Sequence, residues 1–168
     1  MFFPRSSSLR LHAYSDATWA SDSTDHRSLS AYCVFLGGSL IAWKTKKQVT
    51  VSHSSAEAEL RAMALVTAKV TWLWWLLEDF GVSVSRPTPL LSDTTSAISI
   101  ARDPVKHEFA KNIGVDASYT RAQVQNDVIA LQYRPGHEKP RRPSRKNREP
   151  EPNRTKPRIS LPGSQEPK

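Results

Sequence analysis

The sequence is poor in cysteine and has no long apolar run. Cys33 is the single cysteine among 168 residues, which excludes a disulfide framework and a cysteine metal cluster. The longest apolar run, Val70 to Leu77, is far too short to span a bilayer. The opening residues MFFPR are interrupted too early to act as a secretory signal. We therefore expect an intracellular protein, cytoplasmic or nuclear, that does not enter a membrane.

Apolar residues are also scarce, and the positive charge is unevenly spread. Hydrophobic residues make up 38% of the chain, which is low for a globular protein and suggests that part of it does not fold. The formal net charge is +8. Residues 134–168 hold 11 Lys/Arg and 4 Asp/Glu, whereas residues 1–133 hold 13 and 12. The high positive charge thus belongs to the C-terminal end, which argues against a basic nucleic-acid clamp in the rest of the chain.

The composition changes abruptly after Tyr133. Eight of the twelve prolines lie in 134–168, and no hydrophobic periodicity continues there. Such a segment cannot bury enough apolar surface to offset the entropy cost of ordering. We predict a flexible lead-in over residues 1–8, one folded domain over 9–133, and a disordered, basic, proline-rich tail over 134–168. The tail is expected to be solvated, with weak and unspecific nucleic-acid binding as the alternative.

The first half of the domain predicts three strands in succession. Leu9 to Ser15 alternates apolar and polar residues, as a half-buried strand does. Ser28 to Leu36 is a second strand, and Gly37-Gly38 is a two-residue hairpin signal. Ser39 to Trp43 returns as the third strand, which residues 44–51 can extend. The pattern indicates an antiparallel meander.

A helix follows, and then shorter elements. Ser54 and Glu57 fit a capping box, and residues 55–80 contain no glycine or proline. The segment predicts one long helix or two with a kink, ending before Gly81. The remaining expected elements are a strand over 88–92, helices over 96–101 and 108–125, and a last strand over 127–133. The order β-β-β-α-β-α-α-β predicts an α/β domain with a mixed five-stranded sheet and flanking helices.

Three acidic residues stand in distinctive settings. Asp16 and Asp93 each follow a strand-like run, and Glu59 lies in the early turns of the long helix. Carboxylates supplied by separate elements can converge to hold a divalent cation, as enzymes that cleave phosphodiesters require. On spacing alone, Asp16 could instead cap a turn, and Asp93 could cap the helix at 96. Glu57 competes with Glu59, although the capping box already gives Glu57 a structural task.

Several motifs together resemble the ribonuclease H domain at the end of copia-type retrotransposon polyproteins. YSDATWA at 14–20 is similar to the family's YSDADWAG, and RSLSAYCVFLG at 27–37 to RRSTSGYCFFLG. IAWKTKKQ at 41–48 resembles ISWKSKKQ, SSAEAELR at 54–61 resembles SSAEAEYRA, and residues 72–81 resemble WLRWLLEDLG. The resemblance covers about residues 9–133, with the motifs in the family's order.

This resemblance implies a ribonuclease H-like fold and a function. Asp16, Glu59 and Asp93 match three of the four metal-binding carboxylates of the family, which also serve catalysis. The implied cofactor is Mg²⁺, with Mn²⁺ as an alternative. The implied activity is endonucleolytic hydrolysis of RNA in an RNA–DNA hybrid, leaving a 3′-hydroxyl and a 5′-phosphate. The implied ancestral partner is a reverse transcriptase domain of the same polyprotein.

The end of the chain departs from the family pattern. The fourth family aspartate lies in a segment like LADIFTK, whereas RPGHEKP follows Tyr133 here. Loss of one catalytic ligand predicts weak or absent activity, because such residues act as a unit. Glu138, Asp116 and Asp127 are unsupported replacements for it. The rival interpretation is a non-catalytic retroelement relic that at most binds nucleic acid.

Other candidate residues have weaker support. His137, in the Pro-Gly-His run, resembles the mobile histidine of cellular ribonucleases H, and His53 is expected at the surface. Lys44, Lys46 and Lys47, with Trp43 and Gln48, form a basic strand end that could contact phosphates. The same lysines could equally protect an edge strand from aggregation. Trp72, Trp75 and Leu76 lie at helical spacing and are expected in the core.

Overall fold

The computed structural model describes residues 9–103 and 113–135. The expected lead-in over 1–8 and all but the first two residues of the expected tail over 134–168 lie outside the described residues. The predicted division of the chain at these points, and the disorder of the tail, therefore stay predictions.

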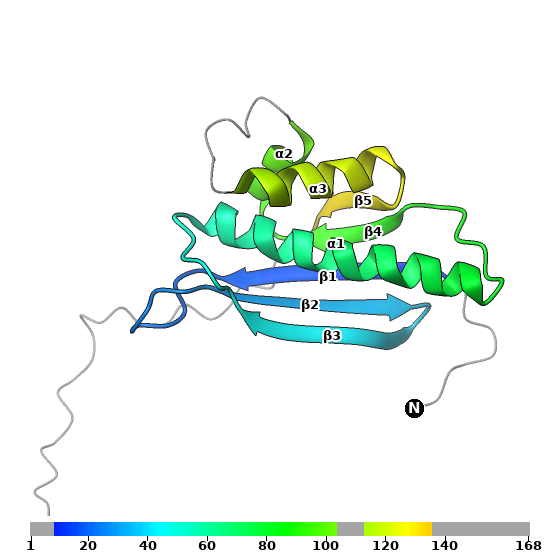
Figure 1. Ribbon diagram of the computed structural model, residues 1–168, viewed down its shortest axis with the longest axis horizontal. Coiled ribbons are helices and arrows are strands. Elements are labelled where there is room, and N and C mark those ends of the chain that lie inside the picture. The colour runs from blue at the N-terminus through cyan, green and yellow to red at the C-terminus, as the bar shows by residue number, and fades with distance from the viewer. Residues whose placement is uncertain (1–8, 104–112, 136–168) are drawn as a thin grey trace, which may run out of the picture. The chain divides into compact units, whose positions relative to one another are not determined.

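The described residues form five strands and three helices in the predicted order (Figure 1). The elements are β1 Leu11–Thr18, β2 Leu29–Leu36, β3 Ser39–Lys47, α1 Ser55–Asp79, β4 Thr88–Ser92, α2 Thr95–Arg102, α3 Gly114–Gln125 and β5 Ile129–Tyr133. The long helical segment is a single helix. Gly37, with a φ of 59°, makes the tight turn that pairs Leu36 with Ser39.

The strands form one mixed sheet in the order β3-β2-β1-β4-β5. The pairs β1–β2 and β2–β3 are antiparallel, as the meander predicts. The pairs β1–β4 and β4–β5 are parallel, so β1 lies at the centre with β4 beside it. The predicted mixed five-stranded sheet is confirmed.

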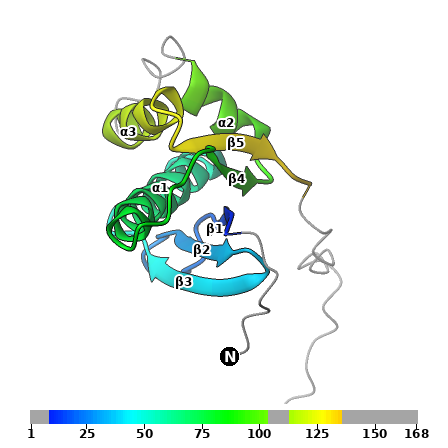
Figure 2. The same cartoon turned by 90° about the vertical axis from the view of Figure 1, so that its right-hand side faces the viewer.

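The core lies between the sheet and α1, which runs along one face of the sheet over β1 and β2 (Figure 2). Alternate residues of β1 face this helix, and Leu11 and Ala13 are buried there. They meet a buried stripe of α1 that includes Leu60, Met63 and Val66. The helix α3 packs beside α1, and α2 lies against α3 and β5 (Figure 1). One packed core therefore fixes the position of the first turns of α1 relative to β1.

Three details differ from expectation. The first strand continues to Thr18, so Asp16 lies inside β1 rather than in a loop after it. This excludes the interpretation of Asp16 as a turn cap. Trp72 and Trp75 are 47% and 62% exposed, and Leu76 is only half-buried and outside the core cluster, so the expected place of these three residues in the core is wrong. Trp74 packs against the core instead, and its Nε1 donates to Thr88 Oγ1 at 2.9 Å.

The helix α1 also has the length and composition of a membrane span, alone among the helices in the described part of the chain. Half of its most apolar stretch is buried within the domain. A core helix has the same character, so this finding assigns no membrane contact.

Candidate metal centre

The two central parallel strands carry two of the predicted acidic residues to the same edge of the sheet. In the β1–β4 register, Tyr14 stands opposite Leu91. Asp16 lies two residues beyond Tyr14, and Asp93 lies two residues beyond Leu91. Equal steps along parallel neighbours keep side chains level. The pairing register therefore explains why residues 77 positions apart in sequence meet.

The first turns of α1 add the third acidic residue. Glu59 is 4% exposed, and its Oε1 accepts a hydrogen bond from the Ala17 backbone N–H at 2.7 Å. This bond fixes Glu59 to β1 one residue after Asp16. Asp93, by contrast, is exposed at the end of β4. The site therefore has a buried, anchored glutamate beside a solvent-accessible aspartate.

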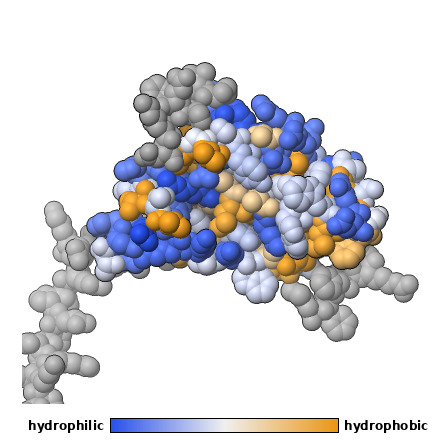
Figure 3. Space-filling model, in the orientation of Figure 1, coloured by the Kyte–Doolittle hydropathy of each residue, from blue (hydrophilic) through white to orange (hydrophobic). Residues whose placement is uncertain are grey.

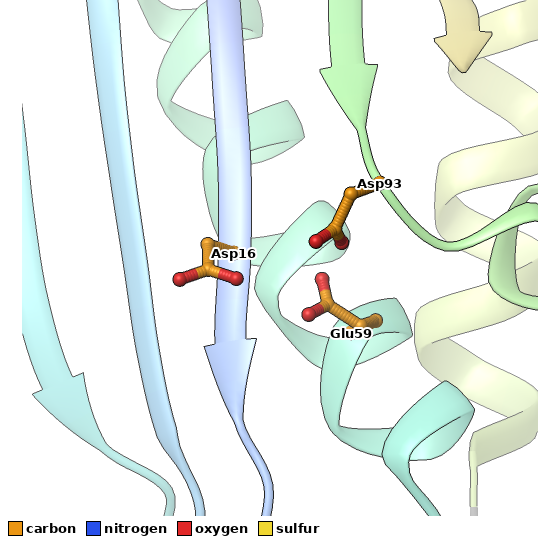
Figure 4. A group of neighbouring side chains, drawn as sticks. All are labelled: Asp16, Glu59 and Asp93. Carbon is orange, nitrogen blue, oxygen red and sulfur yellow. The ribbon is translucent and has the colours of Figure 1, made fainter. Parts of the chain in front are cut away.

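The three carboxylates point toward one another from β1, α1 and the end of β4 (Figure 4). One carboxylate oxygen from each of Asp16, Glu59 and Asp93 lies within 4.8 Å of the others. Carboxylates this close repel one another, and a cation between them relieves the repulsion. An all-oxygen, all-carboxylate donor set fits a hard divalent cation such as Mg²⁺ or Mn²⁺.

The start of α1 explains why Glu59, rather than Glu57, joins this group. Ser54 Oγ accepts from the Glu57 N–H at 3.1 Å, as the capping box requires. The Glu57 carboxylate reaches back to the N–H of His53, one residue earlier than in the standard box. It also pairs with Arg61 at 2.7 Å. Glu57 thus has a structural task at the helix start, and His53 is exposed there.

The alternative that Asp93 caps the following helix does not hold. The N-cap of α2 is Thr94, and no side-chain hydrogen bond caps that helix. Asp93 Oδ1 accepts a local hydrogen bond from Thr94 Oγ1, at 3.2 Å. The Asp93 carboxylate also lies close to the carboxylates of Asp16 and Glu59 at this edge of the sheet.

A buried polar network, which the sequence did not predict, supports this edge of the sheet. Gln48, placed among the basic residues of the strand end, is only 8% exposed. Its Nε2 donates to Ser30 Oγ at 2.8 Å and to the carbonyl of Ala58, the neighbour of Glu59, at 3.0 Å. Its Oε1 accepts from Ser52 Oγ at 2.7 Å. Gln48 thereby connects β2, the loop before α1 and the first turn of α1.

The lysines of the strand end have two different environments. Lys44 and Lys46 are exposed on β3, which is an edge strand of the sheet. Lys47 forms ion pairs with Asp22 and Asp25. Its hydrogen bonds to these carboxylates raise the pKa of Lys47 and hold the pKa of Asp22 well below its usual range. Lys47 is exposed on β3 as well, but its charge is paired with two carboxylates, whereas no ion pair within the described residues involves Lys44 or Lys46.

Comparison with known proteins shows which family the chain is similar to. No protein-family model matches the chain. The retrovirus-related Pol polyprotein from transposon RE1 of Arabidopsis thaliana is 37% identical over 131 residues, which cover 78% of this chain and 9% of the polyprotein. The corresponding polyprotein from transposon TNT 1-94 of Nicotiana tabacum is 27% identical over 121 residues, covering 72% and 9%. The chain therefore spans about a tenth of the length of these relatives.

A solved structure agrees on the fold. The N-terminal ribonuclease H domain of a Mycobacterium tuberculosis protein, solved as a fusion with maltose-binding protein, superposes with a TM-score of 0.51 at 13% identity. The match covers 76% of this chain and 84% of that one. The chain is a homologue of the retrotransposon Pol polyproteins and has the ribonuclease H fold. The family resemblance drawn from the motifs is thereby confirmed.

The described part of this ribonuclease H-like domain offers three carboxylates to the site, not four. Asp116 lies on α3, with its Oδ2 3.9 Å from Arg61 Nε, outside the acidic group. Burial raises the pKa of Asp116, and Arg61 partly opposes this effect. Asp127 lies in the turn after α3, with a φ of 55°. The remaining candidates, His137 and Glu138, lie outside the described residues.

Proposed function

We propose that this chain is a divalent-metal-dependent ribonuclease H of a copia-type retroelement that cleaves RNA in an RNA–DNA hybrid, with impaired activity. The observation that carries the proposal is the convergence of Asp16, Glu59 and Asp93 within 4.8 Å. Homology to Pol polyproteins over 78% of the chain supports the substrate class. The same homology supports a reverse transcriptase as the ancestral partner domain.

Each of the three residues has a distinct part in this proposal. Asp16 and Asp93 would hold the ion from the two central strands, where solvent and substrate can reach them. Glu59, held in place by the Ala17 N–H, would supply a pre-oriented oxygen from the helix side. A Mg²⁺ or Mn²⁺ ion bound there would supply Lewis-acid stabilisation of the phosphodiester oxygens.

The impairment follows from the number of ligands. Three carboxylates hold a first ion adequately, whereas a two-ion site needs further ligands that the described residues do not add. Mg²⁺ demands near-ideal octahedral geometry and loses its water reluctantly. We therefore expect Mn²⁺ to support more cleavage than Mg²⁺. An intracellular location is part of this proposal and rests on the sparse cysteine and the retroelement ancestry.

The test is cleavage of a labelled RNA–DNA hybrid by the full chain in a titration of Mg²⁺ and of Mn²⁺. Asp16→Asn, Glu59→Gln and Asp93→Asn are each expected to lower the Mn²⁺-dependent rate by about 100-fold or more. Asp127→Asn is the matched control, because asparagine tolerates the positive φ at that position. This control should cut within about threefold of the unmodified chain.

The outcomes separate the enzyme from the relic. Cleavage that needs Mn²⁺ and disappears in the three site variants supports the enzyme. Hybrid binding that survives both chelation and these substitutions, with no cleavage in either metal, supports the non-catalytic relic and rejects the proposal. Cleavage that persists in all three variants would mean a contaminating nuclease or a different site, and would also reject it.

A further inference from the structure

The outer face of α1 is unusually apolar for a surface. Trp72, Trp75 and Phe80 are 47%, 62% and 74% exposed. Large aromatic residues are common at interfaces because they bury much area, and a run of them on a free surface is unfavourable. In Figure 3, hydrophobic side chains are interspersed with hydrophilic ones on the side of the domain along which α1 runs. This part of α1 therefore has the composition of an interface.

Trp72 and Trp75 belong to one stripe of the helix, whereas Phe80 is the C-cap residue just beyond it. At about 100° per residue, Leu65, Trp72, Leu76 and Asp79 fall within an arc of about 60°, with Trp75 beside them. The other sides of α1 are already used. One packs Val66 and Val70 against the sheet, and another meets α3, where Tyr119 contacts Thr71. Trp72, Trp75 and Asp79 thus lie exposed on a side of α1 that neither the sheet nor α3 covers, and the other members of the stripe beside them are half-buried.

The charged residues along this stripe can pair with the charged residues of an identical stripe running in the opposite direction. Lys69 stands near one end, with its ammonium 3.7 Å from the centre of the Trp72 ring. Glu78 and Asp79 stand at the C-terminal end of α1, and the last turn contains no basic residue. Carboxylates there face the negative end of the helix dipole, which is unfavourable without a nearby cation.

We infer that this stripe, formed by Leu65, Lys69, Trp72, Trp75, Leu76 and Asp79, binds the same stripe of a second copy of the chain. Antiparallel pairing about a twofold axis near the middle of 69–79 places Lys69 opposite Asp79 of the second copy. It also places Trp72 opposite Leu76. Such an interface is self-complementary, as a twofold contact between identical chains requires. It covers Trp72 and Trp75 and supplies the cation that the end of α1 lacks.

This pairing leaves the acidic site accessible. Glu59 precedes Trp72 by 13 residues, or about 20 Å along the helix axis, and points about 140° away around it. The contact is also small, so we expect a weak dimer whose buried surface area is at the low end for specific interfaces. The inference is independent of the proposed nuclease activity.

The test is the mass of the full chain in solution, measured by analytical ultracentrifugation from low micromolar to about 1 mM. The unmodified chain is expected to pass from one copy to two. Trp72→Gln combined with Trp75→Gln should weaken dimerisation at least about tenfold while preserving the circular dichroism spectrum, because both residues lie outside the core. Trp43→Gln is the matched control, since Trp43 is 68% exposed on β3, away from the stripe, and should leave dimerisation unchanged.

A charge exchange tests the antiparallel register directly. Lys69→Glu and Asp79→Lys should each weaken the dimer, and the double variant carrying both should restore it, because the opposite charges meet again across the axis. A chain that stays single up to about 1 mM overturns the inference and leaves the stripe to another occupant, such as a further polyprotein domain. Dimerisation that Trp43→Gln abolishes, or that the double variant does not recover, also overturns it.

Discussion

Gln48 is the residue that most directly supports the geometry of the acidic site. Its side-chain amide bonds Ser30, Ser52 and the Ala58 carbonyl in a buried setting. Ala58 precedes Glu59, so this amide holds the helix turn that presents the glutamate. Buried polar groups in such a network are costly to leave without their partners.

Gln48→Leu should therefore destabilise the domain. The substitution removes three hydrogen bonds and leaves Ser30 and Ser52 facing an apolar side chain, for an expected loss of about 2–4 kcal/mol of unfolding free energy. Chemical denaturation followed by circular dichroism measures it. The comparison variant is Gln132→Leu, at an exposed position of β5, with an expected change within about 0.5 kcal/mol. Equal effects at the two positions would contradict the role of Gln48.

Single residues show where sequence reasoning works and where it does not. Asp16, Glu59 and Asp93 could be singled out by their motifs. Spacing alone left Asp16 and Asp93 with a plausible turn or capping role, and it left Glu59 in competition with Glu57. Gln48 was placed with the basic residues around it, because a buried glutamine has no periodic pattern of its own. Trp72 and Trp75 were expected in the core because helical spacing alone does not distinguish a face that packs from one that stays exposed.

The elements could be predicted more fully than the residues. Alternation, the Gly37-Gly38 hairpin signal and the long segment without glycine or proline indicated the strands and the main helix. The extension of β1 to Thr18 was missed because Asp16 and Thr18 are polar. The strand continues there because β1 stays paired with β2 as far as Thr18. The parallel β1–β4 pairing brings Asp16 and Asp93 together, and this long-range contact leaves no local signal in the sequence.

The contact between α1 and α3 is expected to depend on pH. Burial raises the pKa of Asp116 above its usual 3.8, while Arg61 on α1 opposes the shift. In the window from about 3.8 up to the raised folded-state pKa, the folded chain binds more protons than the unfolded chain, so this group lowers stability as the pH rises. Below that window its contribution vanishes.

Asp116→Asn should remove this loss. The unfolding free energies of the variant and the parent are expected to differ least near pH 3, with the variant gaining relative stability as the pH rises toward 7. Denaturant titrations at a series of pH values measure this difference. A variant that instead becomes steadily less stable than the parent as the pH rises would show that the ion pair with Arg61 outweighs the burial of Asp116.

In the whole molecule, most of the net positive charge lies in a segment of the sequence that follows the residues of the acidic site. Residues 136–168 hold 10 Lys/Arg and 4 Asp/Glu, a net +6, out of a formal +8 for the chain. Lysine and arginine that neutralise phosphates make binding strongly dependent on salt. Composition could therefore assign the charge to the C-terminal end, although the structural state of that segment stays a prediction.

Deleting residues 136–168 should weaken binding to an RNA–DNA hybrid and flatten its salt dependence. The slope of log affinity against log salt is expected to fall by about 0.7–0.9 for each phosphate that the shortened chain no longer neutralises. Fluorescence anisotropy over a range of salt concentrations measures both quantities. Unchanged affinity and slope would mean that the domain itself binds the phosphates, with Lys44 and Lys46 as the first residues to test.

The central claim is that three carboxylates from β1, α1 and β4 form one divalent-cation site, and calorimetric titration of Mn²⁺ into the full chain tests it most directly. The account predicts saturable binding in the unmodified chain that weakens at least about tenfold in Asp16→Asn, Glu59→Gln and Asp93→Asn, but not in Asp127→Asn. Binding that is the same in all five proteins would contradict it.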